Sequence, residues 1–150
     1  MKVGHLNMSI IPMSQLAETG SHGFFVPESR PVALIAEDDP GVLLVMARMA
    51  KRAGLEVITA TDGAEALIRF KQSPTPLILT DINMPRLDGL QLLRQIKDSF
   101  PETFVILVSA YPDQVGLRDE ADYVLRKPFL MQEFDAAIQA FFNRRGQHQR

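Results

Sequence analysis

LILTD, residues 77–81, places four strand-forming residues directly before an aspartate, and two other stretches of the chain also end on charge. Residues 32–39 read VALIAEDD, and residues 123–127 read YVLRK. Short apolar runs that are separated by helix-length segments indicate buried parallel strands. The carboxyl ends of parallel strands open onto one edge of the sheet, where ligands bind in such folds. We therefore expect the acids of two strands and the lysine of a third to converge at that edge.

The size and charge of the chain limit its class. A chain of 150 residues is long enough for one domain with a substantial core. Its formal net charge of −2 provides no basic field, so neither direct nucleic-acid binding nor a membrane partner is expected. Cysteine is absent, which excludes disulfides, thiol catalysis and cysteine-ligated zinc and favours a cytoplasmic location.

Three segments are predicted along the chain. Residues 1–30 mix Gly, Ser, His and Pro with Met and Phe without a period, which indicates a flexible N-terminal extension and not a signal peptide. Residues 31–145 alternate short apolar runs with amphipathic stretches and form the predicted domain. Residues 146–150 form the predicted C-terminal tail.

This alternation predicts an α/β fold with a doubly wound, five-stranded parallel sheet and five helices. The expected strands are 32–37, 56–60, 77–81, 104–109 and 123–127. The expected helices are 40–53, one capped by 61–62 and running to 72, one that ends before 101, a fourth within 112–121, and 130–144. The fourth should be short or irregular, because Gly116 interrupts it and only Val115 and Leu117 are available for burial. The fifth should bury one face, made of Leu130, Phe134, Ile138 and Phe141.

The residues at the strand ends suit phosphoryl chemistry. Glu37, Asp38 and Asp81 offer oxygen ligands for a hard divalent cation, and Mg²⁺ is the natural candidate. Such an ion, together with the point charge of Lys127, stabilises a phosphoryl group that is delivered to a nucleophile. Asp81, at the tip of a buried strand, is the best-placed carboxylate to attack phosphorus and form an acyl phosphate. Ser109 can then offer its hydroxyl to a phosphoryl oxygen.

Some of these residues have a simpler structural interpretation when they are taken singly. Asp39 suits a helix N-cap, and Asp88-Gly89 is explained by a turn. Ser109 alone would be a strand-end hydroxyl, and Lys127 alone a surface cation. The three acids together resist such an interpretation, because carboxylates at converging strand ends repel one another unless a cation compensates them.

Four sets of residues stand in a fixed order along the βα pattern. They are Glu37-Asp38, then Asp81-Ile82-Asn83-Met84-Pro85 with Asp88-Gly89, then Ser109-Ala110, and finally Lys127-Pro128-Phe129. Each set alone is a weak signal, but the combination is highly specific. Over residues 32–144 the chain resembles the receiver domain of two-component response regulators. This resemblance implies the flavodoxin-like form of the fold, with strand order 2-1-3-4-5.

The resemblance also implies a ligand set for magnesium. Asp38 and Asp81 would bind the ion through their carboxylates, Asn83 through its backbone carbonyl, and Glu37 through water. Asp38, and not Asp39, stands at the family's spacing before Asp81. Every one of these ligands is an oxygen atom, as magnesium prefers.

The same resemblance assigns the phosphoryl chemistry. Asp81 would be the phosphoacceptor, Lys127 would contact the phosphoryl group, and Ser109 would swing toward it. The family further implies a cis peptide bond between Lys127 and Pro128, an isomer that is far more accessible before proline than elsewhere.

The chain departs from the family in the region that follows Ser109. The family's switch uses an aromatic residue three positions before the lysine, where this chain has Val124. Its neighbour Tyr123 should face the other side of the sheet, because side chains alternate along a strand. The segment that leads to Lys127 is also short, so the surface around the fourth helix should be altered. Tyr111 stands where it would flank the path of hydrolytic water, so its ring should slow or shape dephosphorylation.

The predicted function is two-component phosphorelay signalling. A histidine kinase or a histidine phosphotransfer protein would supply the phosphoryl group, and a downstream protein would recognise the changed surface. A homodimer is one candidate assembly, and the chain is either a stand-alone regulator or a receiver from a hybrid kinase or larger regulator. One alternative is a pseudo-receiver that binds partners without phosphorylation. Another is a magnesium-dependent phosphatase, which would need a general acid where Asn83 stands.

Overall fold

Residues 29–149 are described by the computed structural model, and the predicted extension at 1–30 falls almost entirely outside this range. The five strands are β1 (Val32–Ala36), β2 (Glu56–Ala60), β3 (Leu77–Asp81), β4 (Phe104–Ser109) and β5 (Tyr123–Arg126). The helices are α1 (Pro40–Arg52), α2 (Gly63–Gln72), α3 (Gly89–Ser99), α4 (Leu117–Glu120) and α5 (Met131–His148). All four strand pairings are parallel, in the order β2-β1-β3-β4-β5, which confirms the predicted flavodoxin-like sheet.

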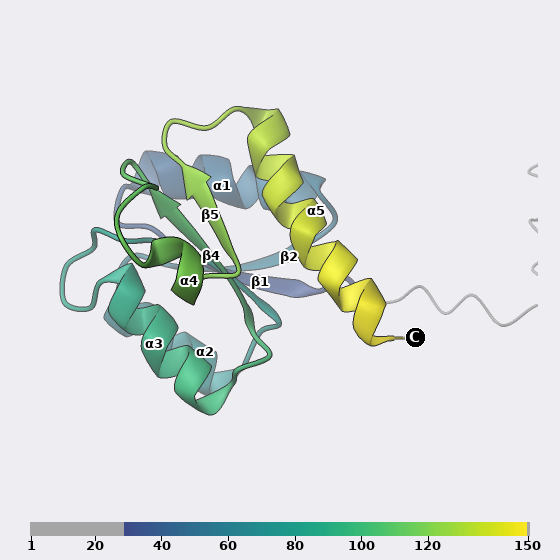
Figure 1. Ribbon diagram of the computed structural model, residues 1–150, viewed down its shortest axis with the longest axis horizontal. Helices are drawn as coiled ribbons and strands as arrows, with labels where there is room; N and C mark the ends of the chain where they lie inside the picture. Colours follow the sequence, from purple (N-terminus) through teal and green to yellow (C-terminus); the bar gives the residue numbers. More distant parts are fainter. Residues whose placement is uncertain (1–28, 150) are drawn as a thin grey trace, which may run out of the picture.

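The sheet separates two hydrophobic cores. Helices α1 and α5 cover one face, and α2 and α3 cover the other, with the short α4 beside α3 (Figure 1). The central strand β3 is buried along its whole length, as its continuous apolar sequence predicts for a strand that is covered on both faces. This strand therefore carries Asp81 to a fixed position at the carboxyl edge of the sheet.

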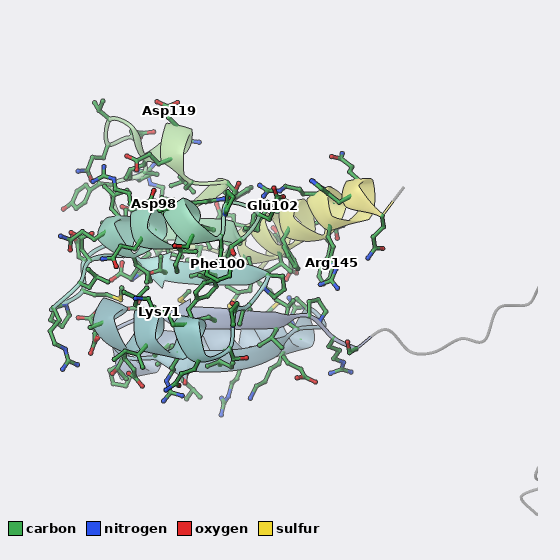
Figure 2. All side chains as sticks on the ribbon, turned by 90° about the horizontal axis from the view of Figure 1, so that it is seen from below. Lys71, Asp98, Phe100, Glu102, Asp119 and Arg145 are labelled. Carbon is green, nitrogen blue, oxygen red and sulfur yellow. The ribbon has the colours of Figure 1, made fainter. Side chains whose placement is uncertain are left out.

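The packing between neighbouring helices is visible from the side of α2 and α3. Figure 2 labels Phe100, which follows the end of α3, next to Lys71 near the end of α2. The Phe100 ring packs edge-on against Phe70 of α2, with ring centroids 5.1 Å apart.

Across residues 29–149, no helix combines the length and the apolar composition that crossing a membrane requires.

Helix starts follow the capping chemistry of the sequence. Asp39 caps α1 by accepting hydrogen bonds from the Gly41 and Val42 N–H groups at 2.8 and 3.0 Å, which confirms its structural role. Asp88, which the sequence marked only as part of a turn, caps α3 in a capping box with Gln91. These caps fix where α1 and α3 begin and hence the loops that join them to the ends of β1 and β3.

The last two helices differ from expectation in detail. Helix α4 has only four residues, as the interruption at Gly116 predicts, but Val115 is 99% exposed and only Leu117 is buried. Leu130 was expected to be buried in the fifth helix, and this prediction is wrong. It precedes the first turn of α5 and is 67% exposed, because the buried face begins at Phe134. Helix α5 continues to His148, beyond the expected end at 144.

Candidate functional site

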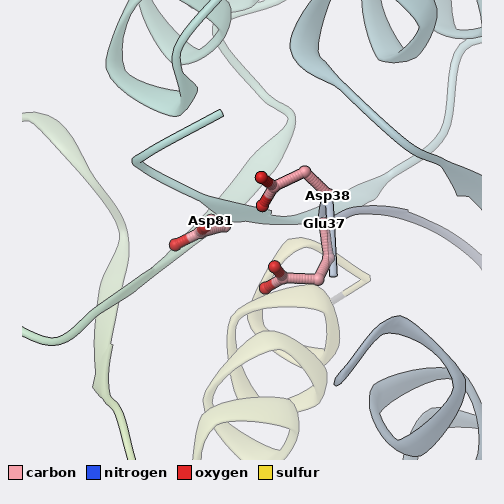
Figure 3. A group of neighbouring side chains, drawn as sticks. All are labelled: Glu37, Asp38 and Asp81. Carbon is pink, nitrogen blue, oxygen red and sulfur yellow. The ribbon is translucent and has the colours of Figure 1, made fainter. Parts of the chain in front are cut away.

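The three predicted acids converge at the carboxyl edge of the sheet. Glu37 and Asp38 follow β1, Asp81 ends β3, and each contributes a carboxylate oxygen to a group in which all lie within 4.8 Å of one another (Figure 3). Glu37 and Asp81 are buried, whereas Asp38 is exposed to solvent. Because β1 and β3 are adjacent parallel strands, their carboxyl ends bring Asp81 together with Asp38 and Glu37, which precede it by 43 and 44 positions in the sequence.

Lys127 supplies the cation that such a group requires. Its Nζ donates a hydrogen bond of 2.7 Å to Glu37 Oε2 and lies 3.3 Å from Asp81 Oδ1. The peptide bond that follows Lys127 is cis, as expected. The lysine reaches the acids from the end of β5, two strands away from β3, so the fold alone explains the convergence.

The proton affinities of the site reflect burial and mutual charge. Burial raises the pKa of Glu37 above its ordinary value, and the charge of Asp81 adds to this, against the hydrogen bonds donated by Lys127 and by the Asp39 N–H. Burial alone would lower the pKa of Lys127, but its hydrogen bond to Glu37 and the charges of both acids outweigh this, and the net pKa is raised. Lys127 is therefore a permanent cation at the site.

The backbone around Asp81 leaves no spare room. The Ile82 N–H donates a hydrogen bond of 2.9 Å to Asp81 Oδ1 and orients the carboxylate. Gly89 packs against the same residue from the start of α3, where an added Cβ would lie 2.0 Å from the Asp81 carbonyl oxygen. Sequence reasoning explained Gly89 by a turn and missed this contact, which only the fold reveals.

Ser109 and Asn83 occupy the two loops beside the acids. Ser109 ends β4, is buried, and accepts a hydrogen bond of 2.9 Å from the Tyr111 N–H. Asn83 lies two residues after Asp81, and its side chain is exposed in the loop that joins β3 to α3. The structure thus brings Glu37, Asp38, Asp81 and Lys127 into one cluster, with Ser109 and Asn83 on the adjoining loops.

The two faces of β5 separate the residues of the expected switch region. Val124 packs with the core that contains Leu117 of α4, whereas Tyr123 packs with the opposite core. The inference that Tyr123 cannot replace an aromatic at position 124 is therefore supported by geometry. Tyr111 is 71% exposed and lines a cavity of about 430 Å³ together with Pro112 and Arg126.

The donor set fits magnesium. Its three candidate ligand groups are carboxylates, with no sulfur or imidazole in the cluster, and hard oxygen donors are the ones that Mg²⁺ takes in proteins. The exposed face of Asp38 leaves the site open to water, which magnesium usually retains. The opposite charge of Lys127 suits an anionic group placed over the ion.

Comparison with known proteins agrees with this geometry. The family model described as "Response regulator receiver domain" matches residues 33–139. The transcriptional regulatory protein PrrA of Mycobacterium leprae is 39% identical over 122 residues, which are 79% of this chain and 52% of that protein. The chain thus spans about half the length of the curated relatives that it matches.

Solved structures share the fold as well. A response regulator receiver domain protein from Clostridium thermocellum superposes with a TM-score of 0.71 at 28% identity, covering 78% of this chain and 98% of that one. The response regulator TrrA from Thermotoga maritima, solved in complex with Mg²⁺-BeF, gives a TM-score of 0.68 at 25% identity and covers 74% and 98% of the two chains.

Proposed function

The chain belongs to the response regulator receiver domains of two-component systems, and from this membership we propose that it accepts a phosphoryl group on Asp81 in a magnesium-dependent reaction. The observation that carries the proposal is the cluster of three carboxylates within 4.8 Å, with Lys127 bonded to one of them and close to another. Bound Mg²⁺ would be held directly by Asp38, Asp81 and the Asn83 carbonyl, and by Glu37 through water. It would neutralise charge on the phosphoryl group during transfer.

The contacts of Asp81 distinguish its two oxygens. Oδ1 accepts a hydrogen bond from the Ile82 N–H and lies 3.3 Å from Lys127 Nζ, so Oδ2 is the oxygen that these contacts leave for attack. In the proposed step, Oδ2 forms a bond to phosphorus, and the bond between phosphorus and the imidazole nitrogen of a donor phosphohistidine breaks. Lys127 then pairs with a phosphoryl oxygen, at the cost of its contact with the acids.

The same phosphoryl chemistry indicates what kind of protein donates the phosphoryl group and what kind of partner responds to it. We assign the donor to a histidine kinase or a histidine phosphotransfer protein and the output to a protein partner that recognises the changed surface. The receiver unit is taken as residues 31–145. The curated relatives include transcriptional regulators about twice as long as the match, so any DNA-binding output would belong to other parts of such proteins.

Intact mass spectrometry tests the proposal. The parent, incubated with Mg²⁺ and acetyl phosphate, should gain one phosphoryl group, and a chelator should abolish the gain. Asp81→Asn should gain none. Asp39→Asn is the matched control, since it removes a neighbouring acid that caps α1 and should still be phosphorylated. A folded parent that binds Mg²⁺ but gains no phosphoryl group would replace this proposal with the pseudo-receiver function.

A further inference from the structure

Arg86 has an unusual backbone conformation close to the site. Its φ of 68° lies in the left-handed region, and it is the one non-glycine residue among residues 29–149 with a positive φ. Non-glycine residues adopt this region rarely, and they keep it when surrounding contacts impose it. Arg86 follows Asp81 by five positions, in the loop that carries Asn83. A contact that holds Arg86 therefore also holds this loop.

The contact is an ion pair with Asp62 at the start of α2. Arg86 Nη2 donates a hydrogen bond to Asp62 Oδ2, while Asp62 Oδ1 accepts one of 2.8 Å from the Glu65 N–H as the α2 cap. The Asp62 side chain is only 2% exposed, and the Arg86 side chain is 70% exposed. A buried carboxylate needs hydrogen bonds and opposite charge, so the buried Asp62 constrains the exposed arginine and not the reverse.

A second contact fastens the same loop to the same helix. An added Cβ on Gly63 would lie 2.0 Å from the Leu87 carbonyl oxygen, so the loop backbone runs directly against the first turn of α2. On its other side, the loop closes through the Gly89 N–H, which donates a hydrogen bond of 2.9 Å to the Ile82 carbonyl oxygen. The loop of residues 82–88 is thus closed by a hydrogen bond between its two ends and is packed along its side against the N-terminus of α2.

We propose that Arg86 is a positioning residue, whose ion pair with Asp62 fixes residues 82–88 so that the Asn83 carbonyl is held at the magnesium site. The inference rests on the proposed function for the identity of the ion. Arg86 itself is bonded to Asp62 and is not one of the proposed ligands of the ion. Its effect is transmitted through the backbone to Asn83, three positions earlier in the sequence.

The expected effect is on ion affinity first. Calorimetric titration with Mg²⁺ alone, without phosphodonor, should show binding to Arg86→Ala weakened by about threefold to tenfold, at or below the lower limit of what changes to residues directly behind a metal ligand cost. The rate of phosphorylation should fall at limiting Mg²⁺ and recover at saturating Mg²⁺. Arg86→Lys should retain part of the affinity, because it keeps the charge.

Arg86→Gly separates the ion pair from the backbone strain. Glycine adopts a positive φ without strain but lacks the guanidinium. If the ion pair positions the loop, Arg86→Gly and Arg86→Ala weaken Mg²⁺ binding alike. If Arg86→Gly binds Mg²⁺ as tightly as the parent, the proposal is overturned.

Two further variants complete the test. Asp62→Asn keeps the cap acceptor but removes the charge, and combining it with Arg86→Ala should cost no more than either change alone if the two act as a pair. Arg118→Ala is the matched control, because this exposed arginine lies in α4. Hydrogen exchange of residues 82–88 in chelator should quicken in Arg86→Ala but not in Arg118→Ala. Unchanged exchange and unchanged Mg²⁺ affinity in Arg86→Ala, with the parent still phosphorylated, would reject the positioning role while the proposed function stands.

Discussion

Lys127 donates a hydrogen bond of 2.7 Å to Glu37, a residue 90 positions away in the chain. The same Nζ lies 3.3 Å from Asp81, so one cation is shared by two buried acids. The Glu37 and Asp81 carboxylates have oxygens within 4.8 Å of each other and therefore repel, and the lysine offsets that repulsion when no metal is present. We therefore expect ion binding at the proposed site to be coupled to folding stability.

Lys127→Met should reveal this coupling. It keeps the apolar stem but leaves Glu37 and Asp81 without their cation. We expect the free energy of unfolding in chelator to fall by about 1–3 kcal/mol, less than for a fully buried pair because Lys127 is partly exposed. Saturating Mg²⁺ should narrow the difference from the parent. Urea unfolding of the parent and the variant, with and without Mg²⁺, measures the two differences in unfolding free energy. An equal loss of stability under the two conditions would argue against the idea that Lys127 and Mg²⁺ compensate the same carboxylates.

Gly89→Ala should directly disturb Asp81, the proposed phosphoacceptor. The new Cβ would meet the Asp81 carbonyl oxygen at 2.0 Å, so either the loop or the strand end must move. We expect a loss of about 2–4 kcal/mol in unfolding free energy and slower phosphorylation. Gly146→Ala is the matched control. It lies in α5 with nothing within 4 Å of the added Cβ, and should gain up to about 1 kcal/mol. A destabilised Gly146→Ala together with an unaffected Gly89→Ala would contradict the packing.

Asp122 should make the domain sensitive to acid. It accepts hydrogen bonds from Lys97 Nζ and the Val105 N–H, both at 2.7 Å, and from Arg144. Burial alone would raise the pKa of Asp122, but these donors outweigh it and the net pKa is lowered. Its contribution to stability is therefore complete above the ordinary value of 3.8 and is lost as the pH falls from there through the lower folded-state pKa.

Asp122→Asn tests whether the stability that Asp122 contributes is lost as the pH falls. The variant should be less stable than the parent by about 1–3 kcal/mol at pH 7, because three donors lose a charged acceptor. The gap should close as the pH falls below 3.8. Urea unfolding of both proteins across pH 3 to 7 gives the comparison, and a gap that is constant with pH would show that the charge of Asp122 is not the cause.

Tyr111→Ala should shorten the lifetime of the phosphorylated protein. The exposed ring lies two residues after Ser109, on the loop beside the acid cluster, and we expect it to restrict the approach of water to Asp81. We expect hydrolysis to accelerate by about threefold, equivalent to roughly 0.7 kcal/mol of barrier. Decay of the adduct after removal of phosphodonor measures the rate. Tyr111→Phe should behave as the parent. An unchanged lifetime in Tyr111→Ala would show that the ring does not protect the adduct from water.

The sequence predicted the layers and the acid cluster because both depend on strand order and strand ends. The bounds of β2, β3 and β4 agree with expectation, since apolar runs such as 77–81 begin and end sharply. Helix ends were less accurate. Leu130 has the spacing of a buried helical residue relative to Phe134, but it precedes the first turn and is exposed.

The contacts around the β3–α3 loop were beyond sequence reasoning. Nothing in the local pattern says that Gly89 lies against the Asp81 carbonyl, or that Arg86 reaches Asp62 of another helix. Both depend on the packing of elements that are distant in the chain. The one available signal was an arginine at a turn position where glycine or asparagine is usual, and it is interpretable only once φ is known.

The fully exposed Val115 gives the molecule a practical use as an optical reporter. Because this chain contains no cysteine, Val115→Cys would give it a single thiol for an environment-sensitive dye. The dye would sit between the loop that carries Tyr111 and the buried anchor Leu117, and nothing packs against the adjoining Gly116 position. Fluorescence from that one site would follow the movements of this loop in real time, without radioactive phosphate or mass spectrometry.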